Sequence, residues 1–257
     1  MQRARELIKP YLDMNGLVGI YVVGSSTRPF RDELSDYDIE VVVDDGAYEA
    51  LPDEKRHVFV IEEGPPRRVD HEFYLRPWSE YEALLQSPLD LFHYPYQHAV
   101  VLHDPSGRVT DVAKRLAELP EAVRAARLRV HYLEYAFALG RARKTAERGG
   151  DLNVRLIYGE ALAALVKLLF LLYGSWPSTL HWTQQELSLL GVSEGLVGRI
   201  METFAHPTKE GLSALTDAVK GELEAHDETF HKDSQALMRW AFLRREGKDA
   251  FATWGGR

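Results

Sequence analysis

The stretch from residue 19 to residue 43 constrains the fold of this chain more than any other. An apolar run breaks at Gly24-Ser25-Ser26, crosses a polar loop and is followed by a second apolar run that carries three acids, Asp36, Asp38 and Glu40. Side chains alternate between the two faces of a strand, so the pattern predicts that the acids share one face. A row of carboxylates beside a core is costly unless a cation neutralises it. The stretch therefore predicts a divalent metal site with oxygen ligands, for Mg²⁺ or Mn²⁺.

Composition narrows the class of protein. The 257 residues include no cysteine, which excludes disulfides, thiolate zinc sites and a cysteine nucleophile. The formal net charge of -8 argues against a nucleic-acid partner, which needs a basic surface, and is compatible with a cationic substrate. The first residues lack the apolar segment of a signal peptide, and Lys167 interrupts the longest apolar stretch. We expect a cytoplasmic protein with no membrane partner.

The periodicity of apolar residues changes near residue 119. Before it we expect strands at 18–23, 36–43, 56–62, 67–75 and 98–102 and helices at 2–14, 78–86 and 109–119. After it we expect only helices, at 122–148, 153–173, 182–190, 194–205, 208–228 and 232–246, and a tail without a clear element. The predicted fold is an α+β domain, residues 1–118, with a mixed sheet flanked by helices, followed by an all-α helical bundle, residues 119–257.

The Gly-Ser turn, ten intervening residues and the Asp-apolar-Asp-apolar run resemble the signature of the polymerase-beta-like nucleotidyltransferase superfamily. The resemblance implies that Gly24, Ser25 and Ser26 hold nucleotide phosphates through backbone N–H groups and a hydroxyl. It implies that Asp36 and Asp38 hold two divalent cations, together with a carboxylate from a later strand. Glycine suits this role because it lets the backbone approach a phosphate closely.

The acids leave two alternatives open. Asp38 and Glu40 satisfy the same pattern, but Asp36 and Asp38 are preferred because Asp36 follows the loop as the family's first acid does. For the third carboxylate, residues 69–74 resemble the acid-bearing strand of aminoglycoside (kanamycin-type) nucleotidyltransferases. That resemblance favours Asp70, with Glu72 as the alternative.

Further residues are assigned by the same resemblance. Leu133-Glu134-Tyr135-Ala136 resembles the context of the general base on the first helix of the family's helical domain, which assigns Glu134 that role. The family's lysine four residues later is Ala138 here, and Lys144 or Lys167 could replace it. Among the flanking arginines, Arg28 is the preferred contact for the triphosphate, because it lies in the loop after Gly-Ser. Residues 174–182, which resemble a loop of uncharacterised bacterial nucleotidyltransferase-like proteins, are expected to wall the acceptor pocket.

Together these features predict a magnesium-dependent nucleotidyltransferase. It would transfer a nucleoside monophosphate from a nucleoside triphosphate, such as ATP, to a hydroxyl of an aminoglycoside-like acceptor and release pyrophosphate. Two alternatives stay open: an antitoxin or regulatory module that binds or modifies a partner protein, and a nucleotidyltransferase acting on RNA ends. The resemblance is also compatible with a homodimer, because a neighbouring subunit completes the active site in some members of the family.

Overall fold

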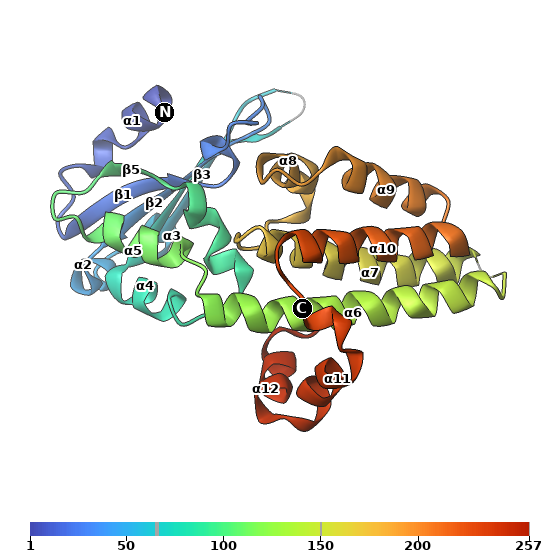
Figure 1. Cartoon of the computed structure of the whole chain (residues 1–257). Helices are drawn as coiled ribbons and strands as arrows, with labels where there is room; N and C mark the ends of the chain where they lie inside the picture. Colours follow the sequence, from blue (N-terminus) through green and yellow to red (C-terminus); the bar gives the residue numbers. More distant parts are fainter. Residues whose placement is uncertain (65–66, 150, 257) are drawn as a thin grey trace. The chain divides into compact units, whose positions relative to one another are not determined.

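The computed structural model describes residues 1–64, 67–149 and 151–256. The chain divides into two compact units, Met1–Glu118 and Leu119–Arg257. The first contains a five-stranded sheet with helices, and the described part of the second consists of helices joined by turns and loops. Figure 1 shows both units with their elements labelled. The predicted fold class, an α+β part followed by a helical part, is confirmed.

The sheet is mixed, as the sequence predicted. Its strands are β1 (Leu17–Val23), β2 (Tyr37–Val43), β3 (His57–Ile61), β4 (Val69–Pro77) and β5 (Val100–His103), in the order β3-β4-β2-β1-β5. Only the pairing of β2 with β4 is parallel within this sheet. The end of β1 therefore lies beside the start of β2, and the start of β2 lies beside the start of β4. Asp38 is the register partner of Val23 on one side and of Glu72 on the other.

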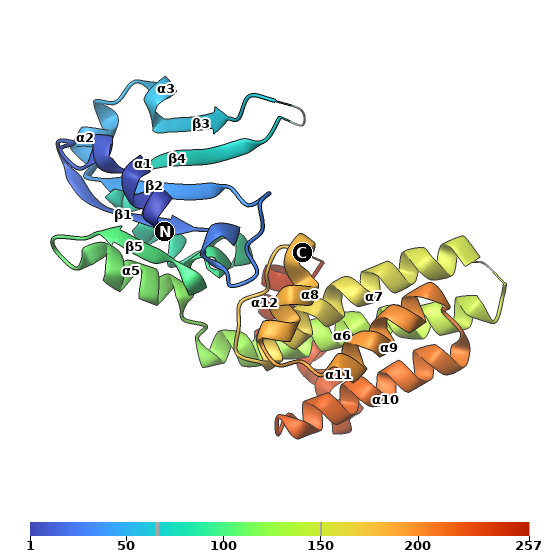
Figure 2. The same cartoon turned by 90° about the horizontal axis from the view of Figure 1, so that it is seen from above.

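Helices cover both faces of the sheet (Figure 2). Ile39 and Val41 of β2 pack with Ala4 of α1 (Gln2–Leu7) in one apolar cluster. Val42 belongs to the opposite cluster, with residues of α4 (Trp78–Leu84) and α5 (Arg108–Ala117). The alternation of β2 between the two clusters puts Asp38 and Glu40 on the face of Val42, as the period of two predicts.

Three parts of the first unit differ from the sequence prediction. The first helix ends at Leu7, and a 3₁₀ turn, Lys9–Tyr11, follows because Pro10 cannot continue an α-helix. The residues after β2, for which no helix was predicted, form helix α2 (Asp45–Glu49), which the Asp44 carboxylate caps by accepting a hydrogen bond from the Ala47 N–H at 2.7 Å. A short helix α3 (Asp53–Arg56) precedes β3.

The helical unit is organised around α6 (Glu121–Ala146) and α7 (Asp151–Leu172), which pack along each other in both views (Figures 1 and 2). Their shared core includes Leu139, Leu165 and Leu168. The remaining helices are α8 (Thr183–Leu189), α9 (Glu194–Ala205), α10 (Lys209–Ala225), α11 (Ser234–Leu243) and α12 (Arg245–Trp254). Single-turn 3₁₀ segments lie at Ser25–Thr27, Asp90–Phe92, Tyr94–His98, Leu180–Trp182 and Phe230–Lys232.

The C-terminal tail is ordered, contrary to the sequence prediction. Residues 251–254 belong to α12, where Ala250 is buried and Phe251 packs against the core of the helical unit. The contact is tertiary, so local sequence did not reveal it. Across the described residues, no helix has the length and apolar character needed to cross a membrane.

Candidate functional site

The turn after β1 is held by two of its own hydroxyl groups. Gly24 has φ 75° and ψ -161°, a backbone conformation that is essentially restricted to glycine. The buried Ser26 hydroxyl donates to the Val23 carbonyl oxygen at 3.4 Å, and the Thr27 hydroxyl donates to the Gly24 carbonyl oxygen at 2.8 Å. Among the described residues, the Ser25 hydroxyl has no hydrogen-bond partner. The structure therefore gives Ser26 a part in shaping the turn and leaves the Ser25 hydroxyl available to a ligand.

Gly24 lies directly against the carboxylate of Asp38. A Cβ atom added to Gly24 would stand 2.0 Å from Asp38 Oδ2, closer than two atoms can approach without bonding. The contact follows from the register of the sheet, in which Asp38 is beside Val23. The turn at Gly24, whose backbone could bind a phosphate, is therefore in contact with the carboxylate of Asp38, which could bind a metal ion.

Three carboxylates gather where β2 and β4 begin. Asp36 precedes β2, Asp38 lies within it, and Glu72 is the register partner of Asp38 on β4. Burial and then the charges of Asp36, Glu72 and Glu40 raise the pKa of Asp38 to about 7. Burial also raises the pKa of Asp36; a backbone hydrogen bond partly offsets this increase, and the charge of Glu72 adds a smaller one. These carboxyl groups repel one another, which is the condition that a bound cation relieves.

Asp70 has a different environment, although it lies on the same strand as Glu72. Its carboxylate is 2.6 Å from His71 Nδ1 and accepts a hydrogen bond from Arg3 Nη2 at 3.2 Å. Burial works to raise the pKa of Asp70, but these two partners outweigh it and hold the pKa below the usual value. Because Asp70 is already paired and Glu72 is the residue beside Asp38, the placement favours Glu72, the alternative, over Asp70 as the third carboxylate.

Glu72 also has neighbours that can orient it. The His57 Nε2 atom lies 3.3 Å from Glu72 Oε2, and the Tyr74 hydroxyl donates a hydrogen bond to the same oxygen. The rings of His57 and Tyr74 stack with centroids 4.3 Å apart. His57 and Tyr74 were not among the residues that the sequence assigned to the site. The alternation of β4 gives Tyr74 the same side as Glu72, whereas only the pairing of β3 with β4 brings His57 there.

Glu40 lies in a buried polar network. Only 5% of the residue is exposed, and its Oε2 atom accepts hydrogen bonds from the Tyr81 hydroxyl at 2.7 Å and the Tyr96 hydroxyl at 3.0 Å. Arg76 Nε lies 3.6 Å from its Oε1 atom. These partners occupy both carboxylate oxygens. The arrangement gives Glu40 a place in the core, and of the three acids in this stretch it leaves Asp36 and Asp38 as the candidates for a metal.

The arginine preferred for the triphosphate is turned into the protein. Arg28 is 4% exposed, its guanidinium lies 4.5 Å from the centroid of the Tyr94 ring, and its Nη2 donates to the Tyr94 carbonyl oxygen at 3.4 Å. Arg31 packs over the Tyr37 ring and donates to its hydroxyl at 2.6 Å. In this structure Arg28 connects the loop after β1 to residue 94.

The donor set fits a hard divalent cation, because carboxylate oxygens are the ligands that Mg²⁺ prefers. Within residues 1–64, 67–149 and 151–256, no group of three histidine, aspartate or glutamate side chains is close enough together to hold a metal ion. Mg²⁺ commonly takes only one or two protein carboxylates and completes its shell with water and substrate phosphates. The pair Asp36 and Asp38 satisfies that requirement, with Glu72, the register partner of Asp38, as an additional donor.

A pocket of about 780 Å³ lies within the helical unit. Its lining includes the predicted base Glu134, together with Ala138 and Lys167 and residues 178–180 of the predicted wall loop. Arg141 and Glu160 also line it and pair with each other at 2.8 Å. Of the two lysines considered from the sequence, Lys167 lines the pocket, whereas Lys144 is exposed and does not.

Glu134 is held in place by hydrogen bonds to both of its oxygens. His131 Nδ1 lies 2.8 Å from Oε2, and the Gly256 N–H donates to Oε1. Burial works to raise the pKa of Glu134, but the hydrogen bonds from His131 and Gly256, with the nearby charge of Lys167, hold it below the usual value. His131 could have been recognised as a partner, since residues three apart share a helix face. The contact with Gly256 could not be predicted, because the two residues are far apart in the sequence.

Comparisons with known proteins describe part of the chain. A family model described as a domain of unknown function, DUF4037, matches residues 90–183. No curated protein matches the chain. Among solved structures, a nucleotidyltransferase-like protein from Exiguobacterium sibiricum 255-15 is similar with a TM-score of 0.45 and 16% sequence identity, over 97% of this chain and 77% of that chain.

Proposed function

We propose that the protein is a metal-dependent nucleotidyltransferase that acts on a small-molecule acceptor. The observation that carries the proposal is the contact between Gly24 and the Asp38 carboxylate, with Asp36 and Glu72 beside it. A metal-bound triphosphate needs an anion-binding turn and cation-binding acids next to each other. In this protein the two are in van der Waals contact.

The first unit supplies the nucleotide site. The backbone and the Ser25 hydroxyl of the turn hold the phosphates of a nucleoside triphosphate. A divalent cation bound by Asp36 and Asp38, with Glu72 beside them as a further donor, would neutralise the triphosphate and lower the pKa of the attacking hydroxyl. His57 and Tyr74 keep the Glu72 carboxylate oriented, as partners of a metal-ligating carboxylate do.

The helical unit supplies the acceptor site. The pocket beside Glu134 holds a hydroxyl-bearing acceptor, and Glu134 takes the proton from that hydroxyl. The acceptor oxygen forms a bond to the α-phosphorus of the nucleotide, the bond from this phosphorus to the bridging oxygen breaks, and pyrophosphate leaves. The carboxylates of Glu134 and Glu160 suit an acceptor with amino groups, such as an aminoglycoside.

The proposal is tested by label transfer. The protein is incubated with each α-labelled nucleoside triphosphate, Mg²⁺ and a panel of aminoglycosides and other hydroxyl-bearing acceptors. We expect transfer by the wild type and a loss in Asp36→Asn/Asp38→Asn that exceeds the roughly 100-fold typical of losing an outer-shell partner of a metal. Equal transfer by both proteins, or no transfer with any acceptor, would contradict the proposal.

A matched pair on β4 tests the choice of the third carboxylate. Glu72→Gln should reduce transfer by about 100-fold or more, whereas Asp70→Asn should reduce it by less than about 10-fold, because Asp70 is paired with Arg3 and His71. Binding of Mn²⁺, followed by its electron paramagnetic resonance signal, should weaken only in Glu72→Gln. The reverse order of the two variants would restore Asp70 as the ligand.

A further inference from the structure

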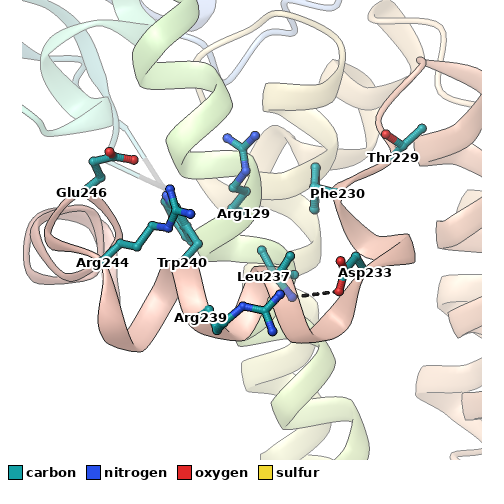
Figure 3. A pocket seen from close by; sticks show the side chains of 10 residues that line it. Arg129, Thr229, Phe230, Asp233, Leu237, Arg239, Trp240, Arg244 and Glu246 are labelled. Carbon is teal, nitrogen blue, oxygen red and sulfur yellow. Dashed lines mark hydrogen bonds between the residues drawn. The ribbon is translucent and has the colours of Figure 1, made fainter.

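A second pocket of the helical unit is lined by three arginines and two aromatic rings. It has a volume of about 400 Å³ and shares no lining residue with the pocket of Glu134. Figure 3 shows Arg129 on α6, Arg239 and Trp240 on α11, and Arg244 at the junction of α11 and α12. Phe230 lies across from Trp240 in the same view. Nothing in the proposed reaction uses these residues.

Arg129 is held in a fixed orientation. Its guanidinium carbon lies 5.7 Å from the centroids of both Phe230 and Trp240, and its Nη1 donates to the Ala125 carbonyl oxygen at 2.9 Å. Two cation–π contacts and one hydrogen bond restrict a side chain that is normally flexible. A guanidinium that is already oriented loses little freedom when it binds an anion.

The arginines of this pocket lack acidic partners. Within the described parts of the chain, no carboxylate lies within 4.0 Å of Arg129, Arg239 or Arg244. The adjacent Arg245, which does not line the pocket, pairs with Asp249 at 3.5 Å. The chain has a net charge of -8, so acidic residues outnumber basic ones, and yet these three arginines have no acidic partner among the described residues.

Two acids also line the pocket, and neither neutralises the arginines directly. The Asp233 carboxylate accepts a hydrogen bond from the Ala236 N–H at 2.8 Å and so caps the start of α11. Glu246 lies in the first turn of α12, a position that complements the helix dipole. The pocket therefore presents guanidinium groups to a ligand beside an aromatic wall.

We propose that this pocket binds a small phosphorylated ligand with a planar ring, of the size of a nucleoside monophosphate. Guanidinium groups bind phosphate through paired, charge-assisted hydrogen bonds. Trp240, Phe230 and Leu237 provide the apolar surface that a planar ring contacts. The site is separate from the nucleotide site of the proposed reaction, so the proposal does not rest on that function.

The test measures binding by isothermal titration calorimetry in EDTA, with Asp36→Asn/Asp38→Asn as the starting protein so that the first unit's metal site is disabled. The probes are AMP, ribose 5-phosphate, which lacks the ring, and adenosine, which lacks the phosphate. We expect AMP to bind, ribose 5-phosphate to bind at least about tenfold more weakly, and adenosine not to bind detectably.

Variants in the same background locate the site. Arg239→Gln/Arg244→Gln should weaken AMP binding by at least about tenfold, and Arg245→Gln, a neighbouring arginine outside the pocket, should leave it unchanged. Circular dichroism confirms that each variant is folded. Absence of AMP binding, equal affinity for AMP in the double variant and its parent, or equal binding of adenosine and AMP would overturn the proposal.

Discussion

At the scale of single residues, Gly24 and Asp38 depend on each other. Gly24 adopts a conformation that other residues avoid, and the space that a side chain would need is occupied by Asp38 Oδ2. The position of the carboxylate therefore depends on the absence of a single methyl group. Asp38 in turn has a raised pKa because burial and neighbouring acids disfavour its charge. Both features are unfavourable for stability, and the proposed binding of a metal-bound triphosphate beside the turn and the acid would account for them.

Gly24→Ala tests this dependence. We expect it to lower the free energy of unfolding by about 2–3 kcal/mol and to abolish label transfer, because the added methyl group displaces the Asp38 carboxylate. The control is Gly107→Ala, where φ is 78° and no atom lies within 4 Å of the added Cβ. This variant should lose only about 1 kcal/mol and retain activity. Urea titration and the transfer assay measure the two effects, and full activity in Gly24→Ala would contradict the role of the turn.

At the scale of elements, Glu40 connects β2 to three other segments. Its carboxylate meets Tyr81 of α4, Tyr96 of the 3₁₀ segment Tyr94–His98, and Arg76 of β4. The ring of Tyr21 on β1 packs edge-on against both tyrosines. This network lies on the same sheet face as the Asp38 side chain, and its hydrogen bonds restrict the movement of the strand that carries Asp38.

Glu40→Ala should destabilise the protein by about 3–4 kcal/mol, because it leaves two buried hydroxyl groups without their acceptor and removes the buried acid that pairs with Arg76. Glu80→Ala removes the other acidic partner of Arg76, which is more exposed, and should cost less than about 1 kcal/mol. Chemical denaturation of the two variants measures the difference. Similar losses in both would show that the buried network contributes little to stability.

The same network predicts how stability depends on alkaline pH. Burial and then the charge of Glu40 raise the pKa of Tyr81 and Tyr96 well above the ordinary value, and burial with the neighbouring Tyr81 does the same for Tyr21. A group whose pKa is higher in the folded state stabilises fully below its unfolded pKa and loses that contribution as pH rises. Stability should therefore hold below pH 10 and fall above it. Absorbance at 295 nm should show these tyrosines ionising together with unfolding, and their ionisation in the native protein would contradict the prediction.

At the scale of the whole molecule, each unit has its own hydrophobic core. The core of the helical unit is drawn from residues 119 onward, and the two clusters of the first unit lie on the two faces of the sheet. A unit that buries its apolar surface internally is expected to fold independently.

Fragments test this expectation. Residues 119–257, expressed alone, should show the circular dichroism of a helical protein and a cooperative thermal transition, and residues 1–118 should unfold cooperatively as well. The helical fragment should also retain AMP binding if the arginine-lined pocket is intact. A fragment with helical far-ultraviolet signal but no cooperative transition would show that its core is incomplete.

The sequence by itself determined most of the strands and helices, and it predicted the chemistry of the proposed nucleotide site. Period-two alternation in residues 36–43 predicted the strand and the shared face of Asp38 and Glu40, and helical periodicity after residue 119 predicted the second unit. These patterns are local, because each depends on the spacing of neighbours along the chain. The contact of Gly24 with Asp38 also follows closely from a strand, a turn and the next strand.

Only the tertiary structure decided which partners each acid has. Asp70 and Glu72 stand two residues apart on one strand, and the parallel register with β2 places Glu72 beside Asp38 while Arg3 and His71 bind Asp70. The tyrosines that bond Glu40 come from α4 and from a 3₁₀ turn, both far from β2 in the sequence. Helix α12 packs through Phe251 against a core that is formed mostly by residues earlier in the chain. Strand register and long-range packing depend on residues that are distant in sequence, so the local spacing of residues does not predict them.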